Sequence, residues 1–392
     1  MKDKLKKVMM FSAFLWMTTN FHHPVTPSHF TNLGLPSHVF GTSYAMMVFG
    51  SFLSGPIWGS WGDRHSRSKV IVFSTLIYGF SQIGFGYSTS LGAILFFRGL
   101  SGVANGGFGG ALMAAIVDTS TIENRRTAMS NYTALMLISA SLGYLIGGIL
   151  GYYPPQYVIY TQGILIILIS FGFKHIVGET QEYINPNSDK KIVFIWDILK
   201  NKEKTKELFD FKIIIFLALT FFIFIAYSSN LNAFNYYLKA QLNLKPIVNG
   251  LWKALTGIIG LIANLTINVW LFRKKDIKKS LMGLVALATL SAVMIVLNTS
   301  FYPFMIWNLL FFTLHTIQLP ILQNFAVQGN STDVGFMSGV YSAVRALGEV
   351  VGATVAGFAY NINSLAPFVV SSVALFIALI FSIVGRKDSK ES

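Results

Sequence analysis

The sequence contains no cysteine, and few of its residues carry a charge. The lack of cysteine excludes disulfide bonds, cysteine-ligated zinc, iron–sulfur clusters and thiol catalysis. Charged residues make up 12% of the 392 positions, whereas a soluble domain averages about 25%. Hydrophobic residues make up 53%. A chain this apolar needs lipid around it, which argues against an ordinary soluble enzyme.

Motifs for nucleotide hydrolysis and for catalysis are lacking as well. No G-x-x-x-x-G-K-[ST] occurs, so nothing indicates ATP as the energy source. The glycine-rich run Gly106–Gly110 follows no strand and lies in an apolar stretch, where it is typical of helix packing. Since no H-E-x-x-H, nucleophile elbow or catalytic carboxylate pair is present, the sequence predicts no enzyme, no cofactor and no metal site.

Twelve apolar runs have about the 20-residue length that crosses a bilayer as a helix. The first run is predicted to be a helix kinked by Pro24 and Pro27, and it lacks the cleavage site of a signal peptide. An even number of spans puts both termini on one side of the membrane. The runs cover residues 8–31, 37–58, 70–88, 92–116, 128–150, 157–177, 212–237, 247–271, 280–298, 303–328, 335–359 and 365–385.

The basic residues indicate which side that is. All but five of the 30 Lys and Arg residues lie at the termini or in alternate loops, so the positive-inside rule places both termini in the cytoplasm. The net charge of +14 is therefore explained by topology and by anionic inner-leaflet lipid rather than by nucleic acid. The five exceptions are Lys239 and Lys245 in outer loops and Arg98, Lys253 and Arg345 within spans.

One long polar segment divides the twelve spans into six and six. We expect an N-terminal six-helix bundle over 1–177, a cytoplasmic linker over 178–211 and a C-terminal six-helix bundle over 212–392. The fifth and eleventh spans both read L-G-x-x-x-G, and small residues four apart let helix backbones approach closely. The glycines of this repeated pattern are Gly143, Gly147, Gly348 and Gly352. The prediction is an all-α membrane protein of two pseudo-symmetric bundles.

The loop after the second span carries a family resemblance. Residues 59–69 read GSWGDRHSRSK, which resembles the major facilitator superfamily signature G-x-x-x-D-R-x-G-R-[RK]-x, with Ser66 where glycine is usual. In the fourth span, Arg98 and Gly102 look like the R-x-x-x-G element of drug exporters. In the fifth span, the run ending at Gly148 is similar to the antiporter motif G-P-x-x-G-G, with Tyr144 in place of proline.

The resemblance implies the twelve-helix major facilitator fold, export against proton entry, and a conformational latch. In that family the loop aspartate meets the start of the eleventh helix, where a helix dipole favours a carboxylate. The loop arginine pairs with an acid at the end of the fourth helix. Asp63, Arg64 and Arg67 are carried over as the loop charges and Asp118 as that acid; the alternative is ordinary solvated loop charges.

Two charged residues share one face of the eleventh span. Arg345 lies about 15 Å into the span by helical rise, and Glu349 is one turn further on. Charges at the bilayer centre cost about 2.5–3.5 kcal/mol each and are usually functional. Either the pair is a structural ion pair, or substrate binding to Arg345 frees Glu349 to take a proton.

Two further cations lie within spans. The resemblance gives Arg98 a role in proton coupling or substrate contact, and the alternative is a structural role as a donor to neighbouring carbonyls. Lys253 lies about six residues into the eighth span, and snorkelling to the outer interface is the expected fate of its ammonium group; the alternative is a role in substrate binding or proton coupling.

Polar uncharged and histidine side chains complete the candidate set. Histidine titrates near neutral pH and suits proton coupling. Adjacent helical residues point about 100° apart, so one residue of the His22–His23 pair should face a cavity and the other should pack. Asparagines late in the seventh span indicate either a hydrated gate or an outer loop that begins earlier. The remaining candidates are Asn20, Asn232, Asn235, His315 and Gln318.

The interior cations favour an anionic or zwitterionic substrate by Coulomb's law. We therefore expect a monomeric secondary transporter in the cell membrane, in contact with lipid and driven by the proton gradient. It would export a small metabolite such as a metallophore. The alternatives that stay open are a multidrug efflux antiporter, a channel, a receptor and a lipid flippase.

Overall fold

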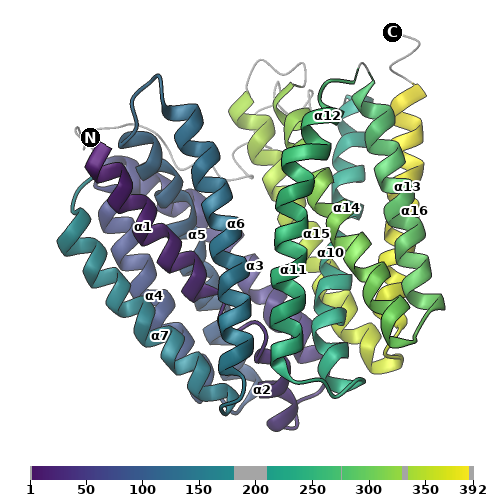
Figure 1. Ribbon diagram of the computed structural model, residues 1–392, viewed down its shortest axis with the longest axis horizontal. Coiled ribbons are helices and arrows are strands. Elements are labelled where there is room, and N and C mark those ends of the chain that lie inside the picture. Colours follow the sequence, from purple (N-terminus) through teal and green to yellow (C-terminus); the bar gives the residue numbers. More distant parts are fainter. Residues whose placement is uncertain (1, 181–209, 275, 329–333, 388–392) are drawn as a thin grey trace. The chain divides into compact units, whose positions relative to one another are not determined.

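The computed structural model describes residues 2–180, 210–274, 276–328 and 334–387, and within these ranges every regular element is a helix (Figure 1). Ten of the helices in these ranges are long and apolar enough to cross a membrane. Two further long helices, α1 and α3, correspond to the first two predicted spans. Most of the predicted linker, 181–209, lies outside the described residues, together with its six lysines.

The helices before the linker agree with the predicted spans to within a few residues, except in the first span. They are α1 Lys2–Thr19, α2 Thr26–Asn32, α3 His38–Arg64, α4 Arg67–Tyr87, α5 Leu91–Asp118, α6 Arg125–Leu150, α7 Pro155–Gly172 and the π-helix η1 Phe173–Val177.

The helices after the linker also follow the predicted spans. The eighth predicted span is made of three consecutive helical pieces, because its middle turn is a π-helix. The elements are α10 Phe211–Ala240, α11 Pro246–Ala263, η2 Asn264–Asn268, α12 Val269–Leu271, α13 Ile277–Leu297, α14 Phe301–Gln328, α15 Val334–Ile362 and α16 Ala366–Lys387.

The first predicted span is broken rather than kinked, and the prediction of one continuous helix was wrong. The chain leaves α1 after Thr19, and residues 20–25 form turns before α2 starts. Proline cannot supply the amide that a continuing helix needs, so Pro24 ends the regular pattern. Pro27 then stands in the first turn of α2, where a missing amide costs nothing.

Contacts between Cα atoms divide the chain into two compact units. Unit 1 comprises Met1–Val39, Met46–Ile192 and Leu238–Ile258, and unit 2 comprises Phe40–Ala45, Val193–Tyr237 and Ile259–Ser392. The units thus exchange two short stretches relative to the predicted bundles. The division of the chain into two six-helix bundles joined by a cytoplasmic linker stays a prediction.

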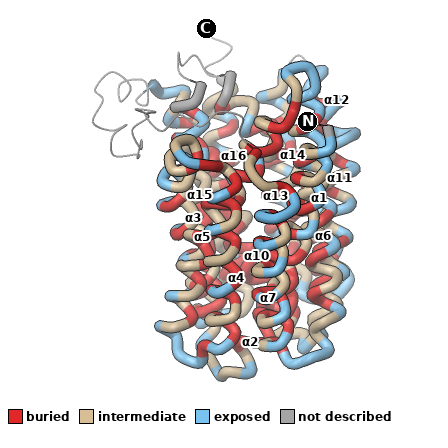
Figure 2. The backbone as a smooth tube through the Cα atoms, turned by 90° about the vertical axis from the view of Figure 1, so that its left-hand side faces the viewer, coloured by how far each residue is buried: buried red, intermediate tan, exposed pale blue. Residues whose placement is uncertain are grey.

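The core of unit 1 is built around α4, which packs on α5 and α7. Its buried residues recur every three or four positions, as helical packing on one face requires; they include Val70, Ser74, Tyr78 and Phe85. In unit 2, α13 packs in the same way on α14 and α16. Figure 2 shows buried and exposed residues alternating along the helices.

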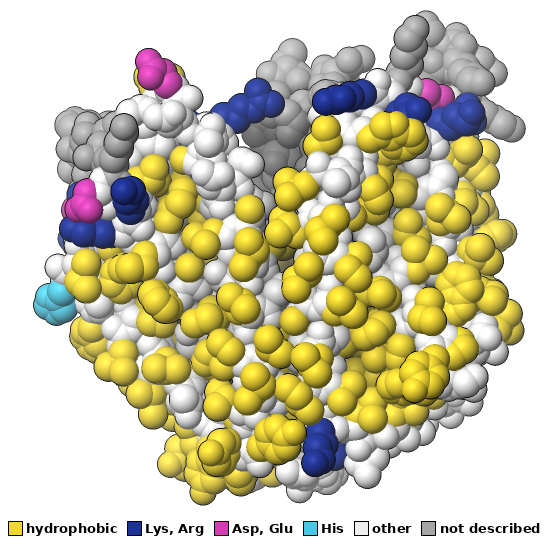
Figure 3. Space-filling model, viewed as in Figure 1, with side chains coloured by type: hydrophobic (Ala, Val, Ile, Leu, Met, Phe, Trp, Pro, Cys, Tyr) yellow, Lys and Arg dark blue, Asp and Glu magenta, His cyan; other side chains and the backbone are white. Residues whose placement is uncertain are grey.

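The outer sides of the helices are apolar where a water-soluble protein would be polar. Phe96 is 63% exposed, Leu265 65% and Ile306 62%. Figure 3 shows hydrophobic side chains along the length of the helices and Lys and Arg side chains near their ends. This distribution is that of a multi-pass membrane protein, in which lipid covers the apolar surface.

Candidate transport site and latch

Arg98 of α5 is buried, with only 3% of its surface exposed, and neutral groups contact its guanidinium. Its Nη1 lies 3.1 Å from Nε2 of His22 and its Nη2 lies 3.3 Å from Sδ of Met47. The guanidinium carbon stands 5.3 Å from the centre of the Phe85 ring, within cation–π range. The arginine therefore keeps its positive charge in the interior of unit 1.

His22 is fully buried, and its two ring nitrogens have different neighbours. A guanidinium can only donate, so Nε2 of His22 must accept from Arg98. The proton of the neutral ring then lies on Nδ1, where its acceptor is the carbonyl of Thr19, because the atom of Gln162 that lies 3.1 Å from Nδ1 is the amide nitrogen, itself a donor. Gln162 also donates to the carbonyl of Thr19 at 2.8 Å. His22 thus supports Arg98 with a fixed tautomer.

His23 and Lys253 lie in the same unit as Arg98. The His23 ring lies 4.0 Å from the His22 ring and stacks on Tyr144 at 5.1 Å, both measured between centroids. The expectation that the two rings diverge assumed a helix, whereas both residues lie in the turn between α1 and α2. Lys253 is only 8% exposed, so the expected snorkelling of its ammonium to the outer interface was wrong.

In unit 2, Arg345 and Glu349 of α15 form the predicted ion pair. Nε of Arg345 lies 2.9 Å from Oε1 of Glu349, and the hydroxyl of Tyr44 lies 3.4 Å from Oε2. The hydroxyl of Ser228 donates to the backbone carbonyl of Glu349 at 2.7 Å. The Arg345 guanidinium also stands 5.0 Å from the Phe224 ring centre. Both acceptor oxygens of the carboxylate therefore have a donor.

Two further predicted residues of α14 lie in unit 2. His315 stacks on Tyr227 at 3.9 Å and meets Phe224 edge-on at 5.4 Å. Gln318, one turn further along α14, is 1% exposed. The candidate histidines thus belong to different units, His22 and His23 to the first and His315 to the second.

The asparagines of the seventh span are helical and buried. The helix α10 continues to Ala240, so the alternative of an outer loop that begins earlier was wrong. Asn232 is 3% exposed and donates to the carbonyl of Ser228 at 2.8 Å, and Asn235 is 6% exposed. Asn20 instead caps the end of α1 by donating to the carbonyl of Trp16 at 2.7 Å.

The glycines of the repeated pattern stand where two backbones nearly touch. A Cβ on Gly143 or Gly147 of α6 would collide with the carbonyls of Met17 and Phe21. The pattern recurs in unit 2. There, a Cβ on Gly348 or Gly352 of α15 would meet the carbonyls of Phe221 and Ile225.

Gly148 makes a different close contact. A Cβ on this residue would lie 3.0 Å from Cα of Gly250, so it lets α6 approach α11.

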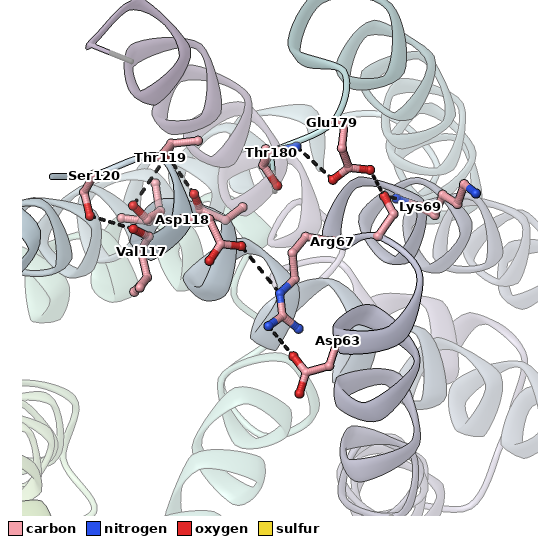
Figure 4. A network of polar contacts seen from close by, with 12 residues as sticks. Asp63, Arg67, Lys69, Val117, Asp118, Thr119, Ser120, Glu179 and Thr180 are labelled. Atoms are coloured by element: carbon pink, nitrogen blue, oxygen red, sulfur yellow. Dashed lines mark hydrogen bonds and ion pairs between the residues drawn. The ribbon is translucent and has the colours of Figure 1, made fainter. Parts of the chain in front are cut away.

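Three of the predicted latch residues, Asp63, Arg67 and Asp118, form one cluster at the start of α4 (Figure 4). Arg67, the first residue of α4, pairs with Asp63, and its Nε lies 3.6 Å from Oδ2 of Asp118. Asp118 is the last residue of α5 and Arg64 is the last residue of α3. Gly62 leaves the space that the Arg67 side chain occupies, since a Cβ there would lie 3.1 Å from Nη1.

Several contact residues were missed by the sequence analysis. Tyr44 and Ser228 contact Glu349 of α15, and Tyr227 stacks on His315 of α14, but no sequence spacing relates these residues to their partners. Gln162 did carry a signal, because a polar amide in an otherwise apolar span is costly unless it has a partner. Glu179, which reaches the same loop as the latch, was passed over as a linker residue.

Comparisons with known proteins agree with this geometry. The family model described as Major Facilitator Superfamily matches residues 8–348. Multidrug resistance protein 2 of Bacillus subtilis (strain 168) is 22% identical, and the alignment covers 94% of this chain and 92% of that protein. The Staphyloferrin B transporter of Staphylococcus aureus (strain NCTC 8325 / PS 47) is 23% identical over 39% of this chain and 36% of its own.

Solved structures show the same fold. A mutant of the nucleoside transporter NupG has a TM-score of 0.80 at 13% identity, covering 98% of this chain and 99% of that one. The human organic anion transporter MFSD10 has a TM-score of 0.65 at 15% identity, covering 97% and 99%.

Proposed function

The chain belongs to the Major Facilitator Superfamily, and we propose that it exports a small anionic or zwitterionic metabolite, such as a metallophore, in exchange for protons. As a multi-pass membrane transporter of that family, it moves a small molecule and is not an enzyme. The proposal adds the substrate class, the direction and the coupling ion to that assignment.

The charge balance of the membrane interior carries the proposal. Within the described spans the deeply placed cations are Arg98, Lys253 and Arg345, and the one carboxylate away from the helix ends is Glu349. Three cations cost roughly 8–10 kcal/mol in a bilayer on insertion scales, and one acid offsets only part of that. A substrate that brings carboxylates would offset the remainder, whereas an organic cation would add to it.

The ion pair of α15 offers a way to couple such a substrate to protons. A substrate carboxylate that binds Arg345 competes with Glu349 for the same guanidinium. Once displaced, the glutamate carboxylate lies buried without its charge partner, and taking up one proton removes that cost. Substrate binding and protonation are thereby linked at this pair, so transport depends on pH. The opposite movement of protons in an exchange rests on the resemblance to antiporters and not on this pair.

The remaining parts of the proposal concern the orientation in the membrane, the energy source, the oligomeric state and the latch. The excess of Lys and Arg in alternate loops supports a cytoplasmic position for both termini in the cell membrane. The proton gradient would supply the energy without a cofactor, and one chain would suffice as the working unit. The cluster of Asp63, Arg67 and Asp118 would act as the latch that breaks and reforms during the cycle.

A second candidate function is efflux of hydrophobic drugs. The likeness to Multidrug resistance protein 2 covers nearly the whole chain, and aromatic residues make up 15% of the sequence. The likeness to the Staphyloferrin B transporter covers a smaller part of the chain and supports a dedicated metabolite instead. The same experiment distinguishes the two candidates.

The test compares metabolites inside and outside cells with and without the gene under metal limitation. If the proposal holds, a polycarboxylate chelator disappears from the medium of the deletion strain and accumulates inside it. Complementation with the wild-type gene should restore secretion, and complementation with the Arg345→Ala variant should not. Unchanged metabolites together with new sensitivity to hydrophobic drugs would instead establish the second candidate.

A further inference from the structure

The chain turns sharply after the last helical turn of unit 1's sixth span. The π-helix η1 ends at Val177, and Gly178 adopts φ +64°, a backbone conformation that favours glycine. Its amide donates to the carbonyl of Phe173 at 3.2 Å and closes the turn. The turn brings Glu179 and Thr180 beside the start of α4 (Figure 4).

Three hydrogen bonds fasten this turn, and we call the group Ser66, Ser68, Gly178, Glu179 and Thr180 the clasp. The hydroxyl of Ser66 donates to Oε2 of Glu179, while the other carboxylate oxygen accepts from the amide of Thr180 at 2.9 Å. The hydroxyl of Ser68 donates to the carbonyl of Gly178. Bonds to a carboxylate are about twice as strong as bonds between neutral groups, so Glu179 is the main member of the clasp.

Ser66 also begins α4. It is fully buried, its backbone is extended with φ −177° and ψ 131°, and its hydroxyl oxygen accepts from the amide of Lys69 at 3.0 Å. This is the geometry of a helix N-cap. Arg67 is the next residue, so the cap sets the position from which the latch arginine projects. The serine that departs from the family signature thus has two partners that glycine could not bind.

Unit 2 has a corresponding contact, between the start of its third long helix of the half, α13, and the end of the sixth, α16. Asp276 caps α13 by accepting from the amide of Lys279 at 2.8 Å. Its other oxygen lies 3.5 Å from Nη2 of Arg386, near the end of α16. In both units the start of the third helix of the half is therefore fastened to the end of the sixth. The charged partner follows the sixth span in unit 1 and belongs to it in unit 2.

We propose that Glu179 is a positioning residue of the latch, because its carboxylate holds the Ser66 cap from which Arg67 projects. The proposal rests on the transport function proposed above. Without Glu179 the first turn of α4 loses its anchor, and the Arg67 guanidinium no longer stays within reach of both aspartates. With Glu179 in place, by contrast, residues 178–180 stay fastened to the start of α4 when the latch changes partners.

The test uses four variants in proteoliposomes: Glu179→Ala, Glu179→Gln, Arg67→Ala and the double variant Glu179→Ala/Arg67→Ala. Glu179→Ala should lower the maximal transport rate about tenfold with an unchanged KM, since hydrogen bonds to a charged group are of that strength. Glu179→Gln keeps an acceptor for the serine hydroxyl and should recover most of the rate. Glu123→Ala, which removes an exposed glutamate from the neighbouring loop, is the matched control and should transport normally.

The double variant separates positioning from an independent role. If Glu179 acts through Arg67, the double variant should be no slower than Arg67→Ala alone. Rates that fall by the product of the two single effects would overturn the proposal, as would a normal rate for Glu179→Ala.

A substrate-free readout keeps this test separate from the proposed function. The chain lacks cysteine, so spin labels can be attached directly through Tyr153→Cys in unit 1 and Ile362→Cys in unit 2, at positions 65% and 86% exposed. Glu179→Ala should shift the populations of label distances in the same direction as Arg67→Ala. An unchanged distribution contradicts the clasp even if transport is proton-coupled, and a shift without proton-driven transport contradicts only the proposed function.

Discussion

Arg98 and Arg345 are arginines within membrane-spanning helices, one in each unit, but their surroundings differ: Arg98 is buried, whereas the Arg345 side chain is 41% exposed. Arg98 is contacted by a histidine nitrogen, a methionine sulfur and a phenyl ring, none of which carries a negative charge. Arg345 is paired with a carboxylate 2.9 Å away. Arg345 is therefore held by an acidic group, and under the proposed coupling its availability to a substrate depends on that acid.

The two units nevertheless share one pattern of close helix packing. In each, two glycines four residues apart let one helix rest on the carbonyls of another. Tyr144 follows the first of these glycines in unit 1, and Glu349 follows it in unit 2. A single position of a repeated packing motif thus holds an aromatic ring in one unit and the titratable acid in the other. The repeated glycines allow the same close helix packing in both units, whereas the residue that follows the first glycine differs in its chemistry.

The largest expected effect comes from breaking the Arg345–Glu349 pair. Arg345→Ala leaves a buried carboxylate without its partner and removes the proposed anion contact, so transport should fall by at least about a hundredfold. Glu349→Gln keeps the shape and an acceptor for Arg345, so it should retain transport but lose its dependence on pH. Both variants are assayed as substrate flux into inverted vesicles at a series of pH values from mildly acidic to mildly alkaline. Wild-type flux for Arg345→Ala would contradict the proposed coupling.

The next prediction tests whether the close helix packing at the repeated glycines is equally necessary for stability in both units. Gly147→Leu and Gly352→Leu each place a side chain against a backbone carbonyl, and overpacking of this kind costs about 1–3 kcal/mol or more. The melting temperature in detergent should therefore fall by several degrees for both variants. Gly110→Leu in α5, where a Cβ meets nothing within 4 Å, is the matched control. A fall confined to one unit would show that only that helix pair needs the close approach.

Sequence reasoning predicted the helices and the packing glycines more closely than the contacts of the site. Apolar runs and repeated small residues are local signals, and the helices follow them. The pair formed by Arg345 and Glu349 was also local, one helical turn apart. Tyr44 and Ser228, by contrast, reach Glu349 from distant helices, and no local pattern reveals such a contact.

The first span is the opposite case. A local signal for a break was present in its sequence but was interpreted only as a kink. Two prolines within four residues were taken as a kink, although the first follows a stretch that already closes α1 with side-chain hydrogen bonds. Thr18 and Asn20 bond back to carbonyls of their own helix. Because of that break, both histidine rings lie together in a turn. The sequence alone could not predict this arrangement, since it depends on how the chain folds between α1 and α2.

A smaller effect is expected from the histidine that supports Arg98. His22→Leu removes the acceptor of the Arg98 Nη1 proton and leaves a buried donor unsatisfied, so the transport rate should fall about tenfold. His22→Gln offers an amide oxygen instead and should retain most of the rate. Because Nε2 is occupied by a group that never gives up its charge, His22→Gln should also keep the pH profile of the wild type. A flattened profile would show that protons are carried in unit 1.

The smallest effect concerns the cap of α13, which is ionisable, whereas Ser66 in unit 1 is not. The amide of Lys279 and the nearby Arg386 hold the pKa of Asp276 below its ordinary value of 3.8. A depressed pKa means that the ionised cap stabilises the fold above about pH 4 and that this contribution is lost as the pH falls through the folded-state pKa. Since the carboxylate is largely exposed, the contribution should be below about 1 kcal/mol. Asp276→Asn should therefore melt slightly below the wild type at neutral pH and together with it once the carboxyl is protonated, because a neutral aspartic acid and asparagine cap a helix about equally well.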